Sequence, residues 1–459
     1  MKFTTVSSAT AAALVVGLLS SSTHACDHEA VKRATLANQD PAHRAEVHRR
    51  HFLHNAHHMN HHHGKRQSSG SRKYPPQGVT PPKSMTPQEW LDALAAAEKA
   101  GKIPNIPQTK LHASTGAITY PSGTDINSVC SWTQTNCFGA NDISKAPDGV
   151  WALNFDDGPN TPSPTLYKFL QQQNKAATFF LIGSNIAGNP DVIKQAAQMG
   201  VAHFNVHTWS HTVQTTLSNE DIVAELGWTM QIIYDLTGKI PRYWRPPQGD
   251  ADKRVRAVAE EVFGLYAVMW DEECNDWCIT ESGGIAPGCD TAPGNSIASV
   301  QKAIDQATQK SKSPGVILLE HDLTTYSIKA FEEHSWTGIQ KNGWNAMSVG
   351  DFPGNTWYAN AANATSPTTG QTSMLKSARV AVSGSGSGSG ASGSSGNPGS
   401  SSSSSTTYGR PASSTSVRVG ATAGPSGAAS ARVSSSLLGA ASGSVAALLA
   451  VAVGAAALI

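Results

Sequence analysis

The sequence predicts an α/β fold: a distorted (β/α) barrel of about seven parallel strands, with disordered termini. Two observations between residues 148 and 353 support this prediction. Short apolar runs such as V-W-A-L-N-F and A-T-F-F-L-I alternate with amphipathic stretches such as D-V-I-K-Q-A-A-Q-M-G. Continuous apolar strands separated by helices indicate parallel strands that are covered on both faces. About seven such units in roughly 200 residues favour a closed barrel over an open sheet.

The N-terminal residues 1–25 have the pattern of a secretory signal peptide. The weakly basic start M-K-F is followed by an apolar run and a T-H-A cleavage site. Residues 26–66 form a His-rich candidate pro-segment that ends at the dibasic pair Lys65-Arg66. A flexible His-rich run can bind metal, but it is more often solvated chain, so these histidines are not assigned to the site.

Residues 67–147 are interpreted as an N-terminal extension with one helix. Thr86 is expected as the N-cap, Pro87 in the first turn and Gly101 as the end of the helix. The apolar face expected to pack against the protein comprises Trp90, Leu91 and Leu94.

Titratable or aromatic side chains follow five of the apolar runs. Functional groups of parallel α/β folds gather at the carboxyl ends of strands, so these residues test the fold prediction. The groups that follow the runs are Asp156-Asp157, H-T-W-S-H (207–211), R-P-P-Q-G (245–249), D-W (276–277) and His321. One such coincidence is ordinary, but five together indicate a functional site at one rim of the barrel.

His207 and His211 are spaced i, i+4 and can present two imidazoles to one ion from a single helical turn. Alone, such a pair favours surface or capping histidines. One carboxylate would complete a three-ligand site with an open position for water, which is the arrangement of a catalytic zinc. The neighbouring carboxylate of an Asp-Asp pair would then be free to accept a proton from water.

N-F-D-D-G-P, H-T-W-S-H, R-P-P-Q-G, D-W and L-E-H, in this order, resemble the five motifs of the polysaccharide deacetylases (NodB-like, carbohydrate esterase family 4). The resemblance covers residues 148–353 and is specific as an ordered set, although each motif alone is weak. Together with the signal-peptide pattern above and the C-terminal anchor pattern described below, the motifs make the chain most resemble fungal chitin deacetylases anchored by glycosylphosphatidylinositol (GPI). The resemblance implies hydrolysis of N-acetyl groups of N-acetylglucosamine units in chitin, giving chitosan and acetate.

The resemblance also implies a role for each matching residue. Asp157, His207 and His211 would hold a divalent metal, with zinc expected and cobalt able to substitute. Asp156 would be the general base, and His321 would be the general acid that protonates the departing amine.

Other matching residues would support this chemistry. Arg245 would orient Asp156, and Asp276 would pair with His321. The residues expected to face the substrate are Trp277, Leu319 and Gln248. The first two would wall a pocket for the acetyl methyl group, and the main-chain N–H of the third would help to stabilise the oxyanion.

Three positions depart from the family pattern. Asn154 stands where the family usually has threonine, Gln248 where tyrosine is more common, and Glu273 where the fourth motif often has aspartate. None of these changes removes an expected ligand, base or acid.

Residues 354–430 are rich in Ser, Gly and Thr and are interpreted as a stalk. Asn363 begins the sequon N-A-T, a candidate glycosylation site. Residues 431–459 end in an apolar run that fits a GPI-anchor signal removed on attachment, with a tail anchor as the alternative. The candidate attachment residues are Ser426, Gly427 and Ala428.

Six cysteines in a secreted chain indicate disulfides rather than a metal cage. Cys274 and Cys278 are close enough in sequence for a local bridge. The other cysteines of the expected domain region are Cys130, Cys137 and Cys289. This odd number means either that Cys26 is used or that one thiol is free.

A formal net charge of +1 gives no support for a nucleic-acid partner. The expected partners are chitin or chito-oligosaccharides, cell-wall glucan and chitin, and a membrane reached through the GPI anchor. The expected location is the outer face of the plasma membrane, the cell wall, or both. The alternatives are a deacetylase of another acetylated polymer, such as xylan or peptidoglycan, and a catalytically silent cell-wall binding mannoprotein. Intact motifs at five strand ends argue against the silent protein.

Overall fold

The computed structural model describes residues 72–112, 116–286, 289, 296–361 and 370–379. The expected signal peptide, the His-rich segment, Asn363 and the GPI-signal region lie outside these residues. Within the part that is described, no helix combines the length and apolar character needed to cross a membrane.

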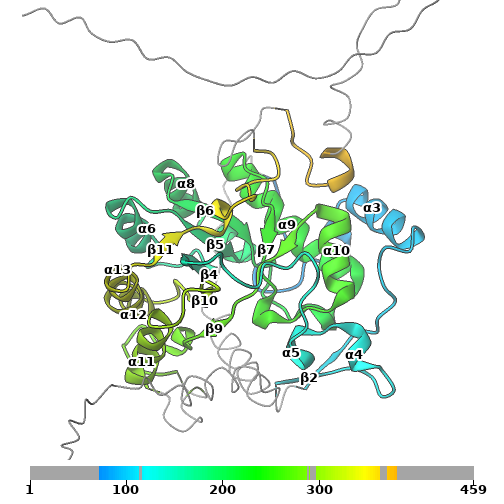
Figure 1. Cartoon of the computed structure of the whole chain (residues 1–459). Coiled ribbons are helices and arrows are strands. Elements are labelled where there is room, and N and C mark those ends of the chain that lie inside the picture. Colours follow the sequence, from blue (N-terminus) through cyan, green and yellow to red (C-terminus); the bar gives the residue numbers. More distant parts are fainter. Residues whose placement is uncertain (1–71, 113–115, 287–288, 290–295, 362–369, 380–459) are drawn as a thin grey trace, which may run out of the picture. The chain divides into compact units, whose positions relative to one another are not determined.

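Five parallel strands form the main sheet of the barrel (Figure 1). In spatial order they are β4 (Asn154–Gly158), β5 (Ala177–Leu181), β6 (Ala202–Val206), β7 (Tyr243–Trp244) and β8 (Tyr266–Ala267). Every residue of β4, β5 and β6 is buried, because helices cover the outer face and side chains fill the inner one.

Four further parallel strands complete the barrel. They are β3 (Val150–Ala152), which pairs with β11 (Asn345–Met347), and β9 (Glu272–Glu273), which pairs with β10 (Leu318–Leu319). Bridges at Trp151–Val316 and Asp156–His321 join the β10 segment to the β3–β4 run. The nine parallel strands make seven runs, because β3 continues into β4 and β8 into β9. This arrangement confirms the predicted distorted barrel.

Helices and one antiparallel hairpin surround these strands. Helices α8 and α9 begin and end at sequence features that favour those boundaries, namely Pro190 and Ser218 at their starts and left-handed Gly200 and Gly238 at their ends. The elements are α4 (Ile126–Val129), α5 (Trp132–Thr135), α6 (Ser163–Gln172), α7 (Gly183–Gly188), α8 (Pro190–Met199), α9 (Asn219–Thr237), α10 (Lys253–Phe263), α11 (Ile297–Thr308), α12 (Thr325–Ala330), α13 (Thr337–Lys341), β1 (Lys110–His112) and β2 (Ala117–Thr119).

The predicted helix of the extension is α3 (Gln88–Lys99), but the prediction of a single helix is wrong, because the short helices α4 and α5 lie in the extension too. Helix α3 begins one residue later than expected: Pro87, with φ −54° and ψ 132°, is the N-cap, and the side chain of Thr86 makes no capping bond. Gly101, with φ +69°, follows the helix as predicted. Trp90 and Leu94 are buried and Leu91 is half-buried, so the helix packs as expected.

Trp90 fixes α3 against the outer helices. Its ring meets those of Trp228 and Phe263 edge-on, with centroids 5.6 and 5.8 Å away. Gly227 makes this approach possible, since a Cβ added there would lie 2.5 Å from the indole ring. The extension is therefore packed into the same core as the barrel.

The packed structure also extends beyond the boundary expected at residue 353. Trp357 and Tyr358 are buried, and Tyr358 pairs with Pro241 in an isolated bridge. Met374, in the last described segment, is buried as well. The Ser/Gly/Thr-rich region thus begins with residues that contribute to the core.

The predicted Cys274–Cys278 bridge is wrong. The disulfides are Cys130–Cys137 and Cys278–Cys289, and Cys274 is a buried free thiol. Cys274 follows β9 and donates to the carbonyl of Leu319 at 3.3 Å, so it faces the neighbouring strand. Cys278 lies in the next turn, which directs its side chain toward a different loop. Closeness in sequence could not reveal these two directions.

Replacing Gly227 with alanine should destabilise the protein by about 1–3 kcal/mol, because the new methyl group overpacks against Trp90. Gly188→Ala is the matched control: it also lies in a helix, but its Cβ would meet only Gln77, at 3.7 Å. Denaturant unfolding of the two variants measures the difference. Equal stability of Gly227→Ala and the unmodified protein would contradict this account of the packing.

Candidate active site

The predicted site residues meet at one rim of the barrel. Asp156 and Asp157 lie at the end of β4, His207 follows β6, Arg245 follows β7 and His321 follows β10. All are almost completely buried, with exposed fractions of 0–3%. The carboxyl ends of neighbouring parallel strands bring them together, as the alternation of strands and helices predicted.

Asp157, His207 and His211 form a compact set of metal-ligating groups, with ligand atoms within 4.8 Å of one another. Oδ1 of Asp157 lies 3.2 Å from Nε2 of both His207 and His211. Among the described residues this buried oxygen has no hydrogen-bond partner. Nδ1 of His207 lies 2.8 Å from the carbonyl oxygen of Arg245, which favours a proton on Nδ1 and leaves Nε2 as a ligand atom.

Electrostatics keep Asp157 ionised. Burial alone would raise the pKa of its carboxyl, but the facing imidazoles of His211, His207 and His321 hold it well below the ordinary value. A carboxylate oxygen and two imidazole nitrogens around one point match the donor set of a divalent transition metal such as zinc. The chemistry of the three residues therefore fits a metal.

The two histidines do not share a helical turn, contrary to the sequence-based expectation. Residues 207–211 form a loop in which Thr208 and His211 adopt left-handed φ values of 64° and 59°. The hydroxyl of Thr208 accepts a hydrogen bond from the N–H of His211 at 3.1 Å. The loop bends back on itself, and this bend, rather than helical periodicity, brings the imidazoles to the same point.

Asp156 occupies a different environment from Asp157. Its Oδ1 accepts a hydrogen bond from Arg245 at 2.7 Å, whereas its Oδ2 lies 3.8 Å from Nε2 of His207. The guanidinium of Arg245 is completely buried and stacks over the ring of Phe180 at 4.3 Å. Its Nε also donates to the carbonyl of Val268 at 2.9 Å. One oxygen of Asp156 is thus held in place while the other faces the metal-ligating group.

Asn154 supports this arrangement, although the sequence identified it only as a departure from the family pattern. Its side-chain oxygen accepts from Arg245 at 2.7 Å. Its amide nitrogen donates to the carbonyls of Ala152 and Leu318 at 2.8 and 3.0 Å. Asn154 therefore joins two strands to the guanidinium. The alternation of β4, which directs residues 154 and 156 to the same side, is the signal that pointed to it.

His321 also lies beside the metal-ligating set. The carboxylate of Asp276 accepts a hydrogen bond from the main-chain N–H of His321 at 2.7 Å and lies 2.8 Å from Nδ1 of the His321 ring. Its Nε2 lies 4.0 Å from Oδ2 of Asp157. Burial lowers the pKa of His321, but the charge and hydrogen bond of Asp276, with the charges of Asp157 and Asp156, outweigh it and raise the pKa to about 10. A protonated imidazole therefore faces the site.

Additional acidic groups surround this centre and were not predicted as part of it. Burial raises the pKa of Glu273 to about 7, of Glu320 to about 8 and of Asp322 to about 7. Nearby carboxylates, including Asp276 and Asp157, add to these shifts. Burial is the main cause of each shift, and the negative charge of the nearby carboxylates adds to it.

The three residues expected to face substrate lie on segments next to these groups. Trp277 follows Asp276 in a short turn, Leu319 belongs to β10, and both are 1% exposed. Gln248 adopts a left-handed conformation with φ 56° in the turn Pro247–Gly249. Trp132 supports this turn so closely that a Cβ on Gly249 would lie 2.2 Å from its ring.

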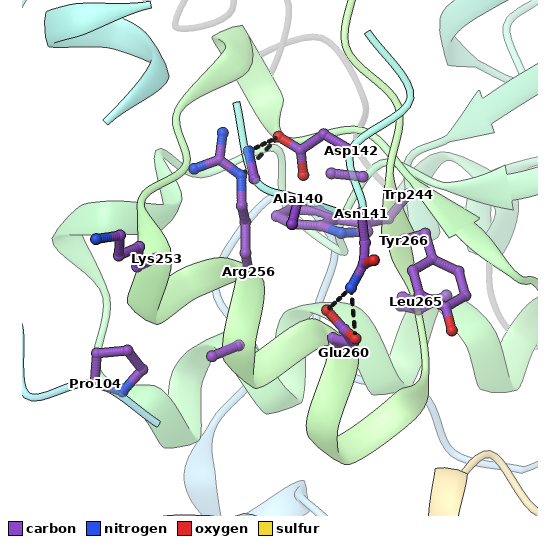
Figure 2. Close-up of a pocket in the computed structure, with 13 residues that line it drawn as sticks. Pro104, Ala140, Asn141, Asp142, Trp244, Lys253, Arg256, Glu260, Leu265 and Tyr266 are labelled. Carbon is purple, nitrogen blue, oxygen red and sulfur yellow. Dashed lines mark hydrogen bonds and ion pairs between the residues drawn. The ribbon is translucent and has the colours of Figure 1, made fainter. Parts of the chain in front are cut away.

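A separate cavity of about 260 Å³ lies outside the barrel, between α10 and the segment 139–142 (Figure 2). Arg256 pairs with Asp142 at 2.8 Å, and Glu260 accepts from the amide of Asn141 at 2.9 Å. None of the expected site residues lines this cavity, and we do not assign it to the active site.

Comparison with known proteins gives a family for this arrangement. Residues 144–267 match the family model described as polysaccharide deacetylase. This part of the barrel is therefore similar to polysaccharide deacetylases. The match includes the first three motifs, whereas the deacetylase motifs at Asp276 and His321 lie beyond it and are placed in the site by the structure.

Several relatives of this deacetylase domain are fungal proteins. Chitin deacetylase 3 of Cryptococcus neoformans is 42% identical over 280 residues, which are 60% of this chain and 64% of that protein. Chitin deacetylase 1 of Saccharomyces cerevisiae is 34% identical over 194 residues, covering 42% and 58%. The chain thus spans less than two thirds of the length of either. The solved chitin deacetylase of Colletotrichum lindemuthianum is 23% identical, with a TM-score of 0.41, over 47% of this chain and 94% of that one.

Replacing Asp276 with asparagine should lower the pKa of His321 from about 10 by about 1–3 units, because the imidazolium loses its charged partner. Histidine proton resonances of the metal-free protein, followed against pH, measure the change. His203 is an internal control, since burial lowers its pKa to about 3 and it does not contact Asp276. An unchanged titration of His321 would contradict the role given to this pair.

The same pair makes stability depend on pH. The folded protein raises the pKa of His321 above its ordinary value of 6.5, so the pair stabilises the fold fully below about pH 6.5. That stabilisation is lost as the pH rises through about 10.

Proposed function

We propose that the protein is a metal-dependent deacetylase that hydrolyses the N-acetyl groups of N-acetylglucosamine units in chitin, giving chitosan and acetate. The observation that carries this proposal is that the two adjacent carboxylates, Asp156 and Asp157, have different surroundings. One carboxylate faces two imidazole nitrogens, and the other is held by a buried guanidinium. The fungal relatives named chitin deacetylase support chitin as the substrate.

Asp157, His207 and His211 would hold the metal, which we propose to be zinc, with cobalt able to replace it. A divalent cation bound by these residues would lower the pKa of a water molecule and polarise the acetyl carbonyl. The three side chains leave the remaining ligand positions to water and substrate, as in catalytic zinc sites.

Asp156 acts as the general base. Its Oδ1 is held by Arg245, so Oδ2, which faces His207, is the oxygen placed to accept the proton of the attacking water. Asn154 and the carbonyl of Val268 fix the guanidinium, which keeps the carboxylate from rotating. Arg245 thereby acts as a positioning residue rather than as a ligand or base.

His321 acts as the general acid. Its Nδ1 is held by Asp276, so Nε2 is the atom that donates a proton to the departing amine. Amines are poor leaving groups unless they are protonated, and the raised pKa of His321 keeps the proton available at neutral pH. Base and acid therefore both lie beside the metal-ligating groups, on adjacent strand ends.

Trp277 and Leu319 would enclose the acetyl methyl group. The main-chain N–H of Gln248 would donate to the oxyanion of the tetrahedral intermediate. A main-chain donor does not depend on the side chain, so glutamine at this position is compatible with the reaction.

We further propose that the protein is secreted and held by a GPI anchor at the outer face of the plasma membrane or in the cell wall. The N-terminal and C-terminal sequence patterns support this location. Attachment at Ser426, Gly427 or Ala428 would place the enzyme beside insoluble chitin and glucan on a Ser/Gly/Thr-rich stalk. Asn363, at the start of that region, is the proposed glycosylation site.

Asp156→Asn should reduce acetate release by about 10²–10⁴-fold while leaving the metal content unchanged, because it removes only the base. Asp157→Asn should lose the metal as well as the activity. Elemental analysis, combined with acetate release from a chitin oligomer, distinguishes the two variants. Loss of metal from Asp156→Asn, with retention by Asp157→Asn, would reverse the two roles.

The substrate is tested by measuring acetate release from chitin, xylan and peptidoglycan with the same preparation. We expect chitin or its oligomers to be the preferred substrates. Preference for another polymer would support the alternative deacetylase. Chitin binding without acetate release, despite bound zinc, would support the silent cell-wall protein.

A further inference from the structure

Glu225 is a buried carboxylate that the proposed reaction does not use. It lies on α9 within the otherwise apolar segment V-A-E-L-G-W, and its exposed fraction is 0%. A carboxylate is costly to bury unless hydrogen bonds compensate it, so its contacts are informative. The hydrogen bonds that its carboxylate accepts lead to the loop 207–211, which carries two of the metal-ligating residues.

Glu225 holds the centre of that loop. Its Oε2 accepts the main-chain N–H groups of Trp209 and Ser210 at 2.7 and 2.8 Å. Its Oε1 accepts the hydroxyl of Ser210 at 2.5 Å. Two consecutive N–H groups that point to one oxygen fix the backbone between the histidines. This stretch is not held by helical hydrogen bonds of its own.

A second segment lies over the same loop. Residues 74–80, which we name the N-terminal strap, contact it from the other side: the indole N–H of Trp209 donates to the carbonyl of Pro76 at 2.8 Å. The ring of Tyr74 stacks on that of Trp209 with centroids 6.2 Å apart. The strap and Glu225 therefore both contact Trp209.

We propose that Glu225, supported by the N-terminal strap, is a positioning residue that sets the shape of the loop 207–211 and thereby the affinity for the metal. The inference rests on the proposed function, which places the metal at this loop. Left-handed Thr208 and His211 cost free energy that the surrounding contacts must offset. Without the anchor, the loop would relax and its two imidazoles would separate.

Glu225→Gln tests the proposal, because glutamine keeps the size but replaces one of the two accepting oxygens with a donor. Metal affinity of the whole chain is measured by competition with a chelator, with zinc and cobalt as the probes. The visible spectrum of bound Co²⁺ reports the ligand geometry. We expect affinity to fall by about 10–100-fold, as for other residues that orient metal ligands, and the Co²⁺ spectrum to change.

Asp250→Asn is the matched control. Asp250 is equally buried and accepts the main-chain N–H and hydroxyl of Thr215, both at 2.7 Å, just beyond the metal loop. It should lower the melting temperature without changing metal affinity. A general loss of stability is thereby separated from a specific effect on the metal.

Wild-type affinity and an unchanged Co²⁺ spectrum in folded Glu225→Gln would overturn the inference while leaving the proposed function intact. If the wild-type protein itself binds neither metal, the proposed function fails first. If Glu225→Gln does not fold, Ser210→Ala decides the question, because it removes the hydroxyl that Oε1 of Glu225 accepts and keeps the main-chain N–H of residue 210. Weaker metal binding by folded Ser210→Ala supports the proposal, and unchanged binding overturns it.

Discussion

The active site depends on a balance of buried charges. Asp156, Asp157 and Asp276 place three carboxyl groups in the barrel mouth beside Arg245 and His321, so acidic groups outnumber these two basic partners. Excess negative charge is costly in a low-dielectric interior. Burial, together with the nearby carboxylates, raises the pKa of Glu273 to about 7, of Glu320 to about 8 and of Asp322 to about 7, which limits any further negative charge. A divalent cation between Asp157 and the two histidines would supply the missing positive charge where it is needed.

Much of this arrangement follows from the sequence, because parallel topology makes strand ends converge. Once V-W-A-L-N-F and the later apolar runs are interpreted as parallel strands, the groups that follow them must lie at one rim. Asp156, His207, Arg245 and His321 meet there for this reason. The helix of the extension was also predictable, to within one residue at its start, from its proline, glycine and apolar spacing.

The remaining features depend on contacts between distant residues. The H-x-x-x-H spacing suggested a helical turn, but residues 207–211 form a loop whose backbone is held by Glu225 of α9. The disulfide partner of Cys278 depended on the direction of a turn rather than on sequence distance. The role of Asn154 could not be predicted, because it depends on hydrogen bonds to Arg245 and to the carbonyl of Leu318, which are distant in the sequence. Local sequence patterns predict strands and helices, but they do not predict which buried polar groups, distant in the sequence, form hydrogen bonds with each other.

The packing of Trp132 bears on how this enzyme can be engineered. Its ring supports the turn that carries Gln248, and Thr133 contacts Asp250 immediately after that turn. Both residues precede residue 144, where the family match begins. A shortened protein cut at that point would keep the residues of the candidate site, but it would lose Trp132, which packs on the Gln248 turn, and the N-terminal strap, which contacts the metal loop. A recombinant form should therefore begin no later than residue 72, because the folded core extends well before the region that matches the family.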